Sequence, residues 1–333
     1  EQSTEQQKQT APCTSCLRAD DAPVETRFSR FEEAPLPEES RAFVKVQDGC
    51  YNHCTYCAIR LVRGRSRSRE IQDVVQEVSE LAQAGYREIQ LSGIHLTAYG
   101  KDLEPKVDLG DLLLALDKIS GVERIRLGSL EPNIIHREMI EKFLRVKTLA
   151  PHLHLALQSG SATVLKRMGR AYTKDEYWNA VKLLRELWPE LELTTDLMVG
   201  FQGETEAEHQ ESMALVRDVG FSDLHIFRYS PRPGTAAMHL SGTVPNVIKK
   251  QRADEAETLR DELHQMALAR QIGKKDRVMI EGLDPLHGYT GTYLPCELVM
   301  PNEAHQLKPE IGALVDVKIL KSKGDGLKAV ILC

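Results

Sequence analysis

Short apolar runs alternate with longer amphipathic segments between residues 42 and 271, and this alternation predicts strands that are each followed by a helix. The runs are four to eight residues long, as expected for strands buried in a sheet. The predicted strands are Ala42–Asp48, Glu88–Ser92, Glu123–Ser129, His152–Gln158, Glu192–Val199 and Asp223–Tyr229.

The helical pattern is clearest after the first strand. There, apolar residues fall on one stripe with a period of 3.6 residues: Ile71, Val74, Val75, Val78, Leu81 and Ala82. Further helices are predicted near residues 108–119, 136–147, 173–187, 204–219 and 245–271. Two of these begin with the spacing of a capping box, Thr173 with Glu176 and Thr205 with Glu208.

Successive strand–helix units predict parallel strands joined by right-handed crossovers. A complete barrel of this type has eight units, so six units predict a partial (β/α)6 barrel over residues 41–271. Active sites of such folds lie at the carboxyl ends of the strands. Candidate functional residues are therefore sought just after each predicted strand.

The two flanking regions differ from the barrel. Residues 1–40 are rich in Gln, Glu, Ser, Thr and Pro and show little apolar periodicity, which predicts a disordered linker or tail. Residues 272–333 contain short β segments between Gly, Pro and Asn turns, which predicts a small all-β barrel. The predicted segments are Arg277–Glu281, Gly291–Leu294, Leu314–Leu320 and Lys328–Leu332.

Composition narrows the class of protein. With 41% hydrophobic and 28% charged residues, the 333-residue chain has the profile of a globular protein, and it has no apolar run long enough to span a bilayer. We expect a cytoplasmic protein with no membrane partner. The net charge of −6 indicates no global affinity for nucleic acid, and a start at Glu1 is consistent with a fragment or processed product.

The cysteines provide the strongest chemical signal. Cys50, Cys54 and Cys57 follow the first strand with the spacing C-x3-C-x2-C. Three thiolates hold three irons of a 4Fe–4S cluster and leave the fourth iron open. S-adenosylmethionine can occupy that iron, and an electron from the cluster splits the cofactor to a 5′-deoxyadenosyl radical. Tyr56 is expected to cover the adenine of the cofactor. The alternatives are a zinc site completed by His53, a redox pair, or inert buried thiols.

The cysteine motif at the head of a six-unit barrel resembles the radical S-adenosylmethionine superfamily. The flanking sequence is similar to its methylthiotransferases, which add a methylthio group to tRNA or to a ribosomal protein. The segments that carry the likeness are VQDGCYNHCTYC, RGRSRSR, IQLSGIHLTAYG, RLGSLEP, HLHLALQSGSATVLKRMGRAYT, TTDLMVGFQGET and YSPRPGTAA. The segments SGIHLTAYGKDL and GYTGTYLP most resemble the branch that modifies threonylcarbamoyladenosine.

The resemblance implies methylthiolation at C2 of threonylcarbamoyladenosine, at position 37 of tRNA. It implies the tRNA anticodon stem-loop as a partner, an electron donor such as flavodoxin or ferredoxin, and an RNA-binding TRAM-like barrel over residues 272–333. The family also carries an N-terminal domain with a second 4Fe–4S cluster, which is expected to be absent here. Cys13 and Cys16 do not match its ligand pattern, and are more simply two linker thiols.

Resemblance and strand-end placement together nominate a pocket for S-adenosylmethionine. Gly93 lets the backbone approach the methionine moiety, although such a glycine also suits a plain turn. Ser129 and Glu131 are expected to bind ribose hydroxyls or the amino group, with helix entry as the alternative. Gln158 ends the fourth strand. Asp196 is a carboxylate in an apolar strand, and it needs a cofactor, an arginine or a structural ion pair as a partner.

A basic segment follows the cysteine motif. It contains Arg60, Arg63, Arg65, Arg67 and Arg69, and is expected to contact phosphates of the tRNA anticodon loop, with a solvated charged face as the alternative. The charges of residues 273–333 balance, so only the resemblance supports RNA binding by that region.

Other functions stay open. The radical chemistry also fits methylthiolation of isopentenyladenosine in tRNA or of a ribosomal-protein aspartate. A different class of function is a non-catalytic RNA-binding module with a structural metal.

Overall fold

The computed structural model describes residues 40–301 and 308–332. The predicted tail over residues 1–40 lies outside this part of the chain apart from Ser40, and so do Cys13, Cys16 and Cys333. Among the described residues, no helix has both the length and the apolar character needed to cross a bilayer.

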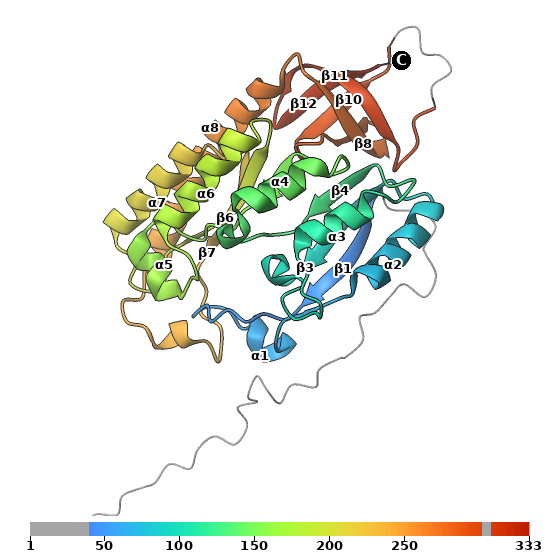
Figure 1. Ribbon diagram of the computed structural model, residues 1–333. Coiled ribbons are helices and arrows are strands. Elements are labelled where there is room, and N and C mark those ends of the chain that lie inside the picture. Colours follow the sequence, from blue (N-terminus) through green and yellow to red (C-terminus); the bar gives the residue numbers. More distant parts are fainter. Residues whose placement is uncertain (1–39, 302–307, 333) are drawn as a thin grey trace, which may run out of the picture.

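Six parallel strands form the curved wall of an incomplete barrel (Figure 1). In spatial order they are β1 (Ala42–Asp48), β3 (Glu88–Gly93), β4 (Arg124–Leu127), β5 (His152–His154), β6 (Glu192–Val199) and β7 (Asp223–Arg228). Between β4 and β5 the ladder is reduced to isolated parallel bridges, Ile125 with Leu149 and Leu130 with Leu155. The short β2 (Arg67–Ser68) pairs antiparallel with β1 at one edge. The predicted α/β barrel fold is confirmed.

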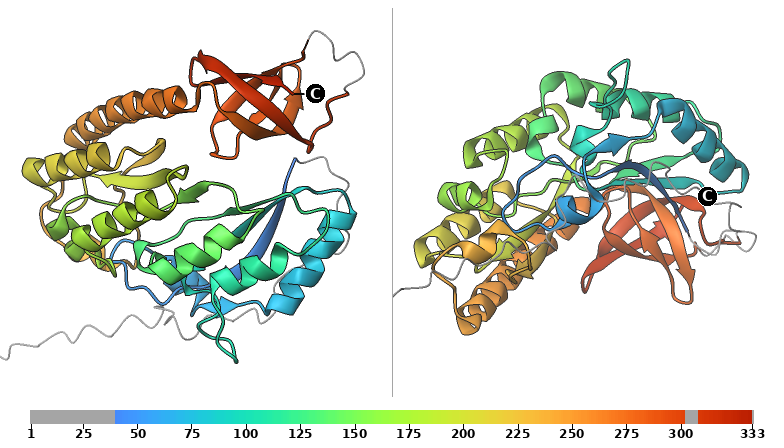
Figure 2. Two further views of the ribbon diagram at one scale, coloured as in Figure 1. Left: turned by 45° about the horizontal axis from the view of Figure 1, so that its top comes forward. Right: turned by 90° about the horizontal axis from the view of Figure 1, so that it is seen from below.

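Helices follow the strands and cover the outer face of the wall, as the two views of Figure 2 show. They are α2 (Ile71–Gln83), α3 (Leu109–Leu116), α4 (Arg137–Arg145), α5 (Ala162–Met168), α6 (Lys174–Leu187), α7 (Glu206–Val219) and α8 (Asn246–Gln271). Short helical turns α1 (Ile59–Arg63), η1 (Leu96–Ala98), η2 (Pro132–Ile134) and η3 (Ala236–His239) lie in the loops. Both predicted capping boxes are present, at the starts of α6 and α7.

The main core lies between the strands and these helices. Val44 and Val46 of β1 are fully buried and belong to the same apolar cluster as Val74 and Val78 of α2. Alternate strand residues therefore face the helices, while the intervening residues face the interior of the barrel. This division leaves the barrel interior free to hold polar side chains.

A second, smaller barrel follows α8. Its strands are β8 (Lys275–Leu283), β9 (Leu286–Tyr289), β10 (Pro295–Val299), β11 (Leu314–Lys323) and β12 (Gly326–Ile331), closed in the order β10-β12-β11-β8-β9. The predicted strand Gly291–Leu294 is wrong, because these residues form the turn between β9 and β10. Tyr293 in this turn has a φ of 66°, which excludes a strand conformation.

The small barrel is attached through a buried ionic cluster at the amino-terminal ends of the strands. Glu88 is completely buried and accepts hydrogen bonds from Arg126 Nε (2.9 Å) and an Arg124 guanidinium nitrogen (3.1 Å). Arg126 also donates to the carbonyls of Thr290 and Gly291 in the β9–β10 turn, at 2.6 and 3.0 Å. One carboxylate therefore holds the arginines that bind the second barrel.

Replacing Glu88 with Gln keeps the shape of the side chain but removes the charge opposite these arginines. Because this breaks a buried ionic cluster, we expect the free energy of unfolding at pH 7 to fall by about 3–5 kcal/mol, measured by chemical denaturation. The matched control is Glu186→Gln in the exposed Arg137–Glu186 pair, which should change stability by less than about 1 kcal/mol. Equal effects of the two substitutions would contradict the assignment.

The difference between wild type and Glu88→Gln should also depend on pH. Burial opposes ionisation of Glu88, but Arg126, Arg124 and Arg41 outweigh it and lower the pKa of Glu88 below 4.5. The stabilisation is therefore complete above pH 4.5 and decreases as pH falls through the lowered pKa. Denaturation curves at pH 7 and at acidic pH should show the difference narrowing.

Candidate functional site

The three motif cysteines come together at the carboxyl ends of the strands. Cys50, Cys54 and Cys57 line one cavity of ≈ 130 Å³, and no disulfide joins them. The cavity is also lined by Asn52, Tyr56, Ile59, Arg60, Ile94, His95, Glu131 and Arg170. We call it the cysteine cavity. Tyr56 and Glu131, two of the predicted cofactor residues, therefore lie beside the cysteines.

Backbone contacts fix the loop that carries the cysteines. Thr55 donates its amide to the carbonyl of Met168 at the end of α5 (2.8 Å) and accepts from the amide of Ala237 (2.7 Å). Gly49, at the start of the loop, has a φ of +70°, and a Cβ there would lie 2.0 Å from the carbonyl oxygen of Arg65. Only glycine fits this position, because any side chain would overlap the backbone.

Glu131 joins three separate segments of the site. Its carboxylate accepts hydrogen bonds from Asn52 Nδ2 at 2.8 Å and from an Arg170 guanidinium nitrogen at 2.6 Å, and lies 3.2 Å from His95 Nε2. Burial opposes ionisation, but His95 and Arg170 outweigh it and lower the pKa of Glu131 to about 2. The site therefore holds an ionised carboxylate next to the thiols.

Asn52, His95 and Arg170 also affect the pKa values of two of the thiols. Burial raises the pKa of Cys50, but contacts with His95 and the Asn52 amide outweigh it, so the pKa is lowered overall. Cys50 Sγ lies 3.8 Å from His95 Nδ1 and 3.3 Å from the Asn52 nitrogen. Burial raises the pKa of Cys54, although Arg170 donates to its Sγ at 3.2 Å. These N–H groups are suited to stabilise thiolates that bind a metal.

Sequence reasoning did not assign His95 and Arg170 to the site. His95 lies two residues after the end of β3. Arg170 lies in the family-like segment HLHLALQSGSATVLKRMGRAYT, but only the fold brings its side chain to the cysteines.

The other predicted cofactor residues lie elsewhere. Gly93 does not line the cysteine cavity, and a Cβ there would lie 2.8 Å from Leu96 Cδ2 and 3.0 Å from Gln47 Oε1. Its role in the described structure is close packing. Ser129 and Asp196 line a second, larger cavity. Gln158 lies between the two, because its side chain accepts from the Tyr56 hydroxyl (3.1 Å) and donates to Asp196 (3.3 Å).

The larger cavity occupies the barrel interior and has a volume of ≈ 790 Å³. We call it the central cavity. Strand residues line its wall, including Gln90, Ser92, His154, Thr194, Asp196 and His225, and the β9–β10 turn of the small barrel contributes Tyr293. The size falls within the range of pockets that enclose small molecules, about 300–1,000 Å³.

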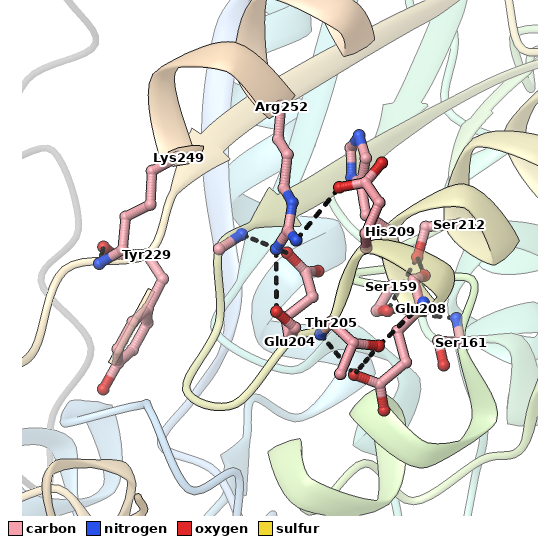
Figure 3. Close-up of polar contacts among 12 residues, drawn as sticks. Ser159, Ser161, Glu204, Thr205, Glu208, His209, Ser212, Tyr229, Lys249 and Arg252 are labelled. Atoms are coloured by element: carbon pink, nitrogen blue, oxygen red, sulfur yellow. Dashed lines mark hydrogen bonds and ion pairs between the residues drawn. The ribbon is translucent and has the colours of Figure 1, made fainter. Parts of the chain in front are cut away.

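The loops after β5 and β6 are held to the outer helices, as Figure 3 shows. Ser212 of α7 lies 3.1 Å from the Ser159 hydroxyl and accepts from the Gly160 amide at 2.9 Å. Glu204 is buried and accepts from Arg252 of α8 at 2.8 Å and from the Gly200 amide at 2.6 Å. These contacts fix the strand ends that carry Gln158 and Asp196.

The five arginines of the basic segment do not form one surface. Arg63 and Arg65 are exposed, and Arg60 lines the cysteine cavity. Arg67 pairs with Asp48 at 3.2 Å. The expected phosphate contact of Arg69 is corrected, because Arg69 is 3% exposed and pairs with Asp73 (2.7 Å) and Glu77 of α2. A buried guanidinium that anchors a helix is not accessible to RNA.

Comparison with known proteins assigns this site to a family. The model of the family described as "Radical SAM superfamily" matches residues 44–216. The chain belongs to the radical SAM superfamily. The matched residues include the three cysteines and five of the six parallel strands, β1 in part and β3 to β6 in full, so the match covers the site as well as the fold.

Curated relatives narrow the family to the methylthiotransferases. The chain is 42% identical over 266 residues to "Threonylcarbamoyladenosine tRNA methylthiotransferase MtaB" of Thermotoga maritima, covering 79% of this chain and 61% of that protein. It is 36% identical over 310 residues to "tRNA-2-methylthio-N(6)-dimethylallyladenosine synthase" of Clostridium botulinum, covering 91% of this chain and 68% of that protein. The chain thus spans about three fifths to two thirds of the length of these relatives.

A solved structure supports the fold. Coproporphyrinogen III oxidase (HemN) from Escherichia coli, a radical SAM enzyme, aligns with a TM-score of 0.51 at 16% identity. The alignment covers 71% of this chain and 54% of that protein. The similarity concerns the barrel architecture.

The residues present fit the cofactors of the family, a 4Fe–4S cluster and S-adenosylmethionine. Cys50, Cys54 and Cys57 supply three thiols to one cavity, which leaves one iron of a cluster without a protein thiolate among the described residues. A zinc site completed by His53 fits less well, because His53 does not line the cysteine cavity and instead contacts Arg60.

We expect each of the substitutions Cys50→Ala, Cys54→Ala and Cys57→Ala to abolish cluster binding. After anaerobic reconstitution, wild type should hold about four irons with sulfide per chain, measured by metal analysis and absorption spectroscopy. Cys296→Ala is the control, because Cys296 is buried in the core of the small barrel. One bound zinc in place of iron in the wild type would contradict the assignment.

Proposed function

We propose that this chain carries the radical SAM part of a tRNA methylthiotransferase that acts on C2 of threonylcarbamoyladenosine at position 37. The observation that carries the proposal is the pairing of two sites. The cysteine cavity, which contains the carboxylate of Glu131, is connected to the central cavity of ≈ 790 Å³ by hydrogen bonds from Tyr56 to Gln158 and from Gln158 to Asp196. One site suits the cofactors and the other suits a nucleobase.

The chain's own residues would hold and orient the cofactors. When bound, the cluster and S-adenosylmethionine supply a 5′-deoxyadenosyl radical. The three cysteines hold the cluster, and Glu131 is available to accept hydrogen bonds from the amino group or ribose hydroxyls of S-adenosylmethionine. Tyr56 and Gln158 separate the two cavities, so they position the cofactor against the substrate.

The lining of the central cavity favours a polar substrate. Gln90, Ser92, Thr194 and the His154–Asp196–His225 group place hydrogen-bonding atoms on part of its wall, beside apolar side chains. A dimethylallyl group would leave these atoms without partners, whereas a threonylcarbamoyl group carries amide, hydroxyl and carboxylate groups. The name of the Thermotoga relative agrees with this choice, while that of the Clostridium relative supports the alternative.

RNA binding is assigned to two surfaces. Arg63 and Arg65 are exposed in the segment that follows Arg60 of the cysteine cavity, and they can contact phosphates of an anticodon stem-loop. The closed five-stranded barrel is proposed to be TRAM-like and to bind the same RNA. An electron donor such as flavodoxin or ferredoxin is proposed to reduce the cluster.

Sulfur insertion needs a source beyond the cysteine cavity. Apart from the three motif cysteines, Cys296 is the one cysteine in the described residues, and it is buried in the small barrel. The experiment for this chain therefore follows hydrogen removal rather than the methylthio product.

The proposed chemistry is tested with an anticodon stem-loop RNA that carries threonylcarbamoyladenosine deuterated at C2. In oxygen-free buffer with dithionite and S-adenosylmethionine, we expect 5′-deoxyadenosine that contains deuterium, measured by mass spectrometry. Cys54→Ala should abolish the product. Glu131→Gln should keep the iron but raise the S-adenosylmethionine concentration needed by roughly tenfold or more, because it removes a charged hydrogen-bond acceptor. Deuterium that stays in the RNA would contradict the proposal.

The RNA surface is tested by reversing the charge of Arg63. Arg63→Glu should weaken binding of tRNA at low salt and reduce the slope of log affinity against log salt by about one, since one phosphate contact is lost. Arg217→Glu is the control, because Arg217 is also exposed but lies on α7 in a pair with Glu262. Binding can be measured by fluorescence anisotropy, and equal losses for both variants would argue against this surface.

A further inference from the structure

The central cavity contains a three-residue group that has no part in the proposed hydrogen removal. His154, Asp196 and His225 come from the adjacent parallel strands β5, β6 and β7. Asp196 Oδ1 lies 3.3 Å from His154 Nε2 and 3.5 Å from His225 Nδ1, and the two imidazole rings stack with centroids 5.4 Å apart. Regular strand pairing therefore holds the three side chains in one arrangement.

This group lies next to the place where the cofactor chemistry would occur. Gln158 Nε2 donates to Asp196 Oδ2, and Gln158 Oε1 accepts from the hydroxyl of Tyr56, which lines the cysteine cavity. Two hydrogen bonds thus connect the group to the wall of the cysteine cavity. A substrate that presents its reacting atom to the cysteine cavity would have its substituents near these histidines.

The two histidines are not equivalent. His154 uses both ring nitrogens, because Nδ1 contacts Thr194 Oγ1 at 3.0 Å and Nε2 faces Asp196. His225 faces Asp196 through Nδ1, lines the central cavity, and has a side chain that is 60% exposed. Within the described residues, Nε2 of His225 is therefore the nitrogen of the group that is available to a ligand.

The other basic side chains of the cavity contact groups of the protein. Arg126 binds Glu88 and two carbonyls of the β9–β10 turn, and Arg41 pairs with Glu88 and Glu281. Arg260 pairs with Asp261, and both ring nitrogens of His264 contact the carbonyls of Ser222 and Asp325. His152 is buried with its Nε2 on Thr194 Oγ1.

The acidic side chains of the cavity restrict where an anion can lie. Asp223, Asp261 and Asp325 line the same cavity and repel a carboxylate. A protonated His225, supported by Asp196, is the position where a negatively charged group finds a donor.

We propose that His225, held in place by Asp196 and His154, donates Nε2–H to the carboxylate of the threonylcarbamoyl group and so selects this substituent over a hydrocarbon one. His225 is then a residue that contacts the substrate, and His154 is a positioning residue. The proposal rests on the function proposed above and adds the side chain that recognises the substituent.

The test measures equilibrium binding of three anticodon stem-loop RNAs to the cluster-loaded protein. The RNAs differ only at adenine 37, which carries threonylcarbamoyl, dimethylallyl or no substituent. His225→Asn keeps an amide at the position of Nδ1 but has no atom at that of Nε2. His225→Gln keeps a donor near Nε2. His239→Asn is the matched control, because His239 is exposed in η3 and lines neither cavity.

We expect wild type to bind the threonylcarbamoyl RNA at least tenfold more tightly than the dimethylallyl RNA. His225→Asn should lose roughly tenfold for the threonylcarbamoyl RNA and less than twofold for the other two, because one charge-assisted hydrogen bond disappears. His225→Gln should keep most of the preference, and His239→Asn all of it. Thermal unfolding followed by circular dichroism shows that the variants are folded.

Several results would overturn the proposal, and they differ from a failure of the proposed function. An equal loss for all three RNAs, no loss in His225→Asn, or tighter binding of the dimethylallyl RNA by wild type each removes the role of His225. If wild type binds none of the three RNAs, the function itself fails, and the role of His225 falls with it.

Discussion

The carboxylate of Glu131 is the contact on which the cysteine site depends. It connects the cysteine loop through Asn52, the end of β3 through His95, and the segment after α5 through Arg170. These three partners come from separate parts of the sequence, and each also contacts a cysteine sulfur. A single ionised group thus fixes the loops and sets the polarity around the thiols.

The barrel separates its apolar and polar side chains by strand alternation. Residues such as Val44 and Val46 pack under the helices and provide the core, so the interior does not have to supply it. The interior is then able to hold Asp196 and two histidines, which would be costly in a packed core. An eight-stranded barrel fills its interior with side chains, whereas this open six-stranded wall leaves a cavity.

Much of the architecture follows from local sequence patterns. The six strands, the helix stripe after β1 and both capping boxes depend on residues close in the chain, so periodicity predicts them. Tertiary contacts decide the failures. Gly291–Leu294 has a strand-like composition, but Arg126 binds its backbone and makes it a turn. The sequence predicts Arg69 to be one of five exposed arginines, but it is buried in ion pairs with acidic residues of α2.

The candidate site divides in the same way. The cysteine spacing is local and predicts the loop, whereas His95, Arg170 and the grouping of His154, Asp196 and His225 arise only when separate strands align. Asp196 shows why. A carboxylate within an apolar strand signals a required partner, but the sequence does not say which. The register of β6 with β7 places Asp196 opposite His225, and β5 brings His154 to the other side.

The junction between the two barrels links stability to recognition. Glu88 pairs with arginines at the amino-terminal ends of the strands. Arg126 also binds the carbonyls of the β9–β10 turn and holds this turn beside the central cavity. The N–H donors of these arginines already bind protein groups, so the part of the central cavity that they line does not attract anions. Among the described residues, a carboxylate in this cavity therefore meets the donor proposed above, His225 on β7. The ionic cluster that attaches the small barrel thus also contributes to substrate selectivity.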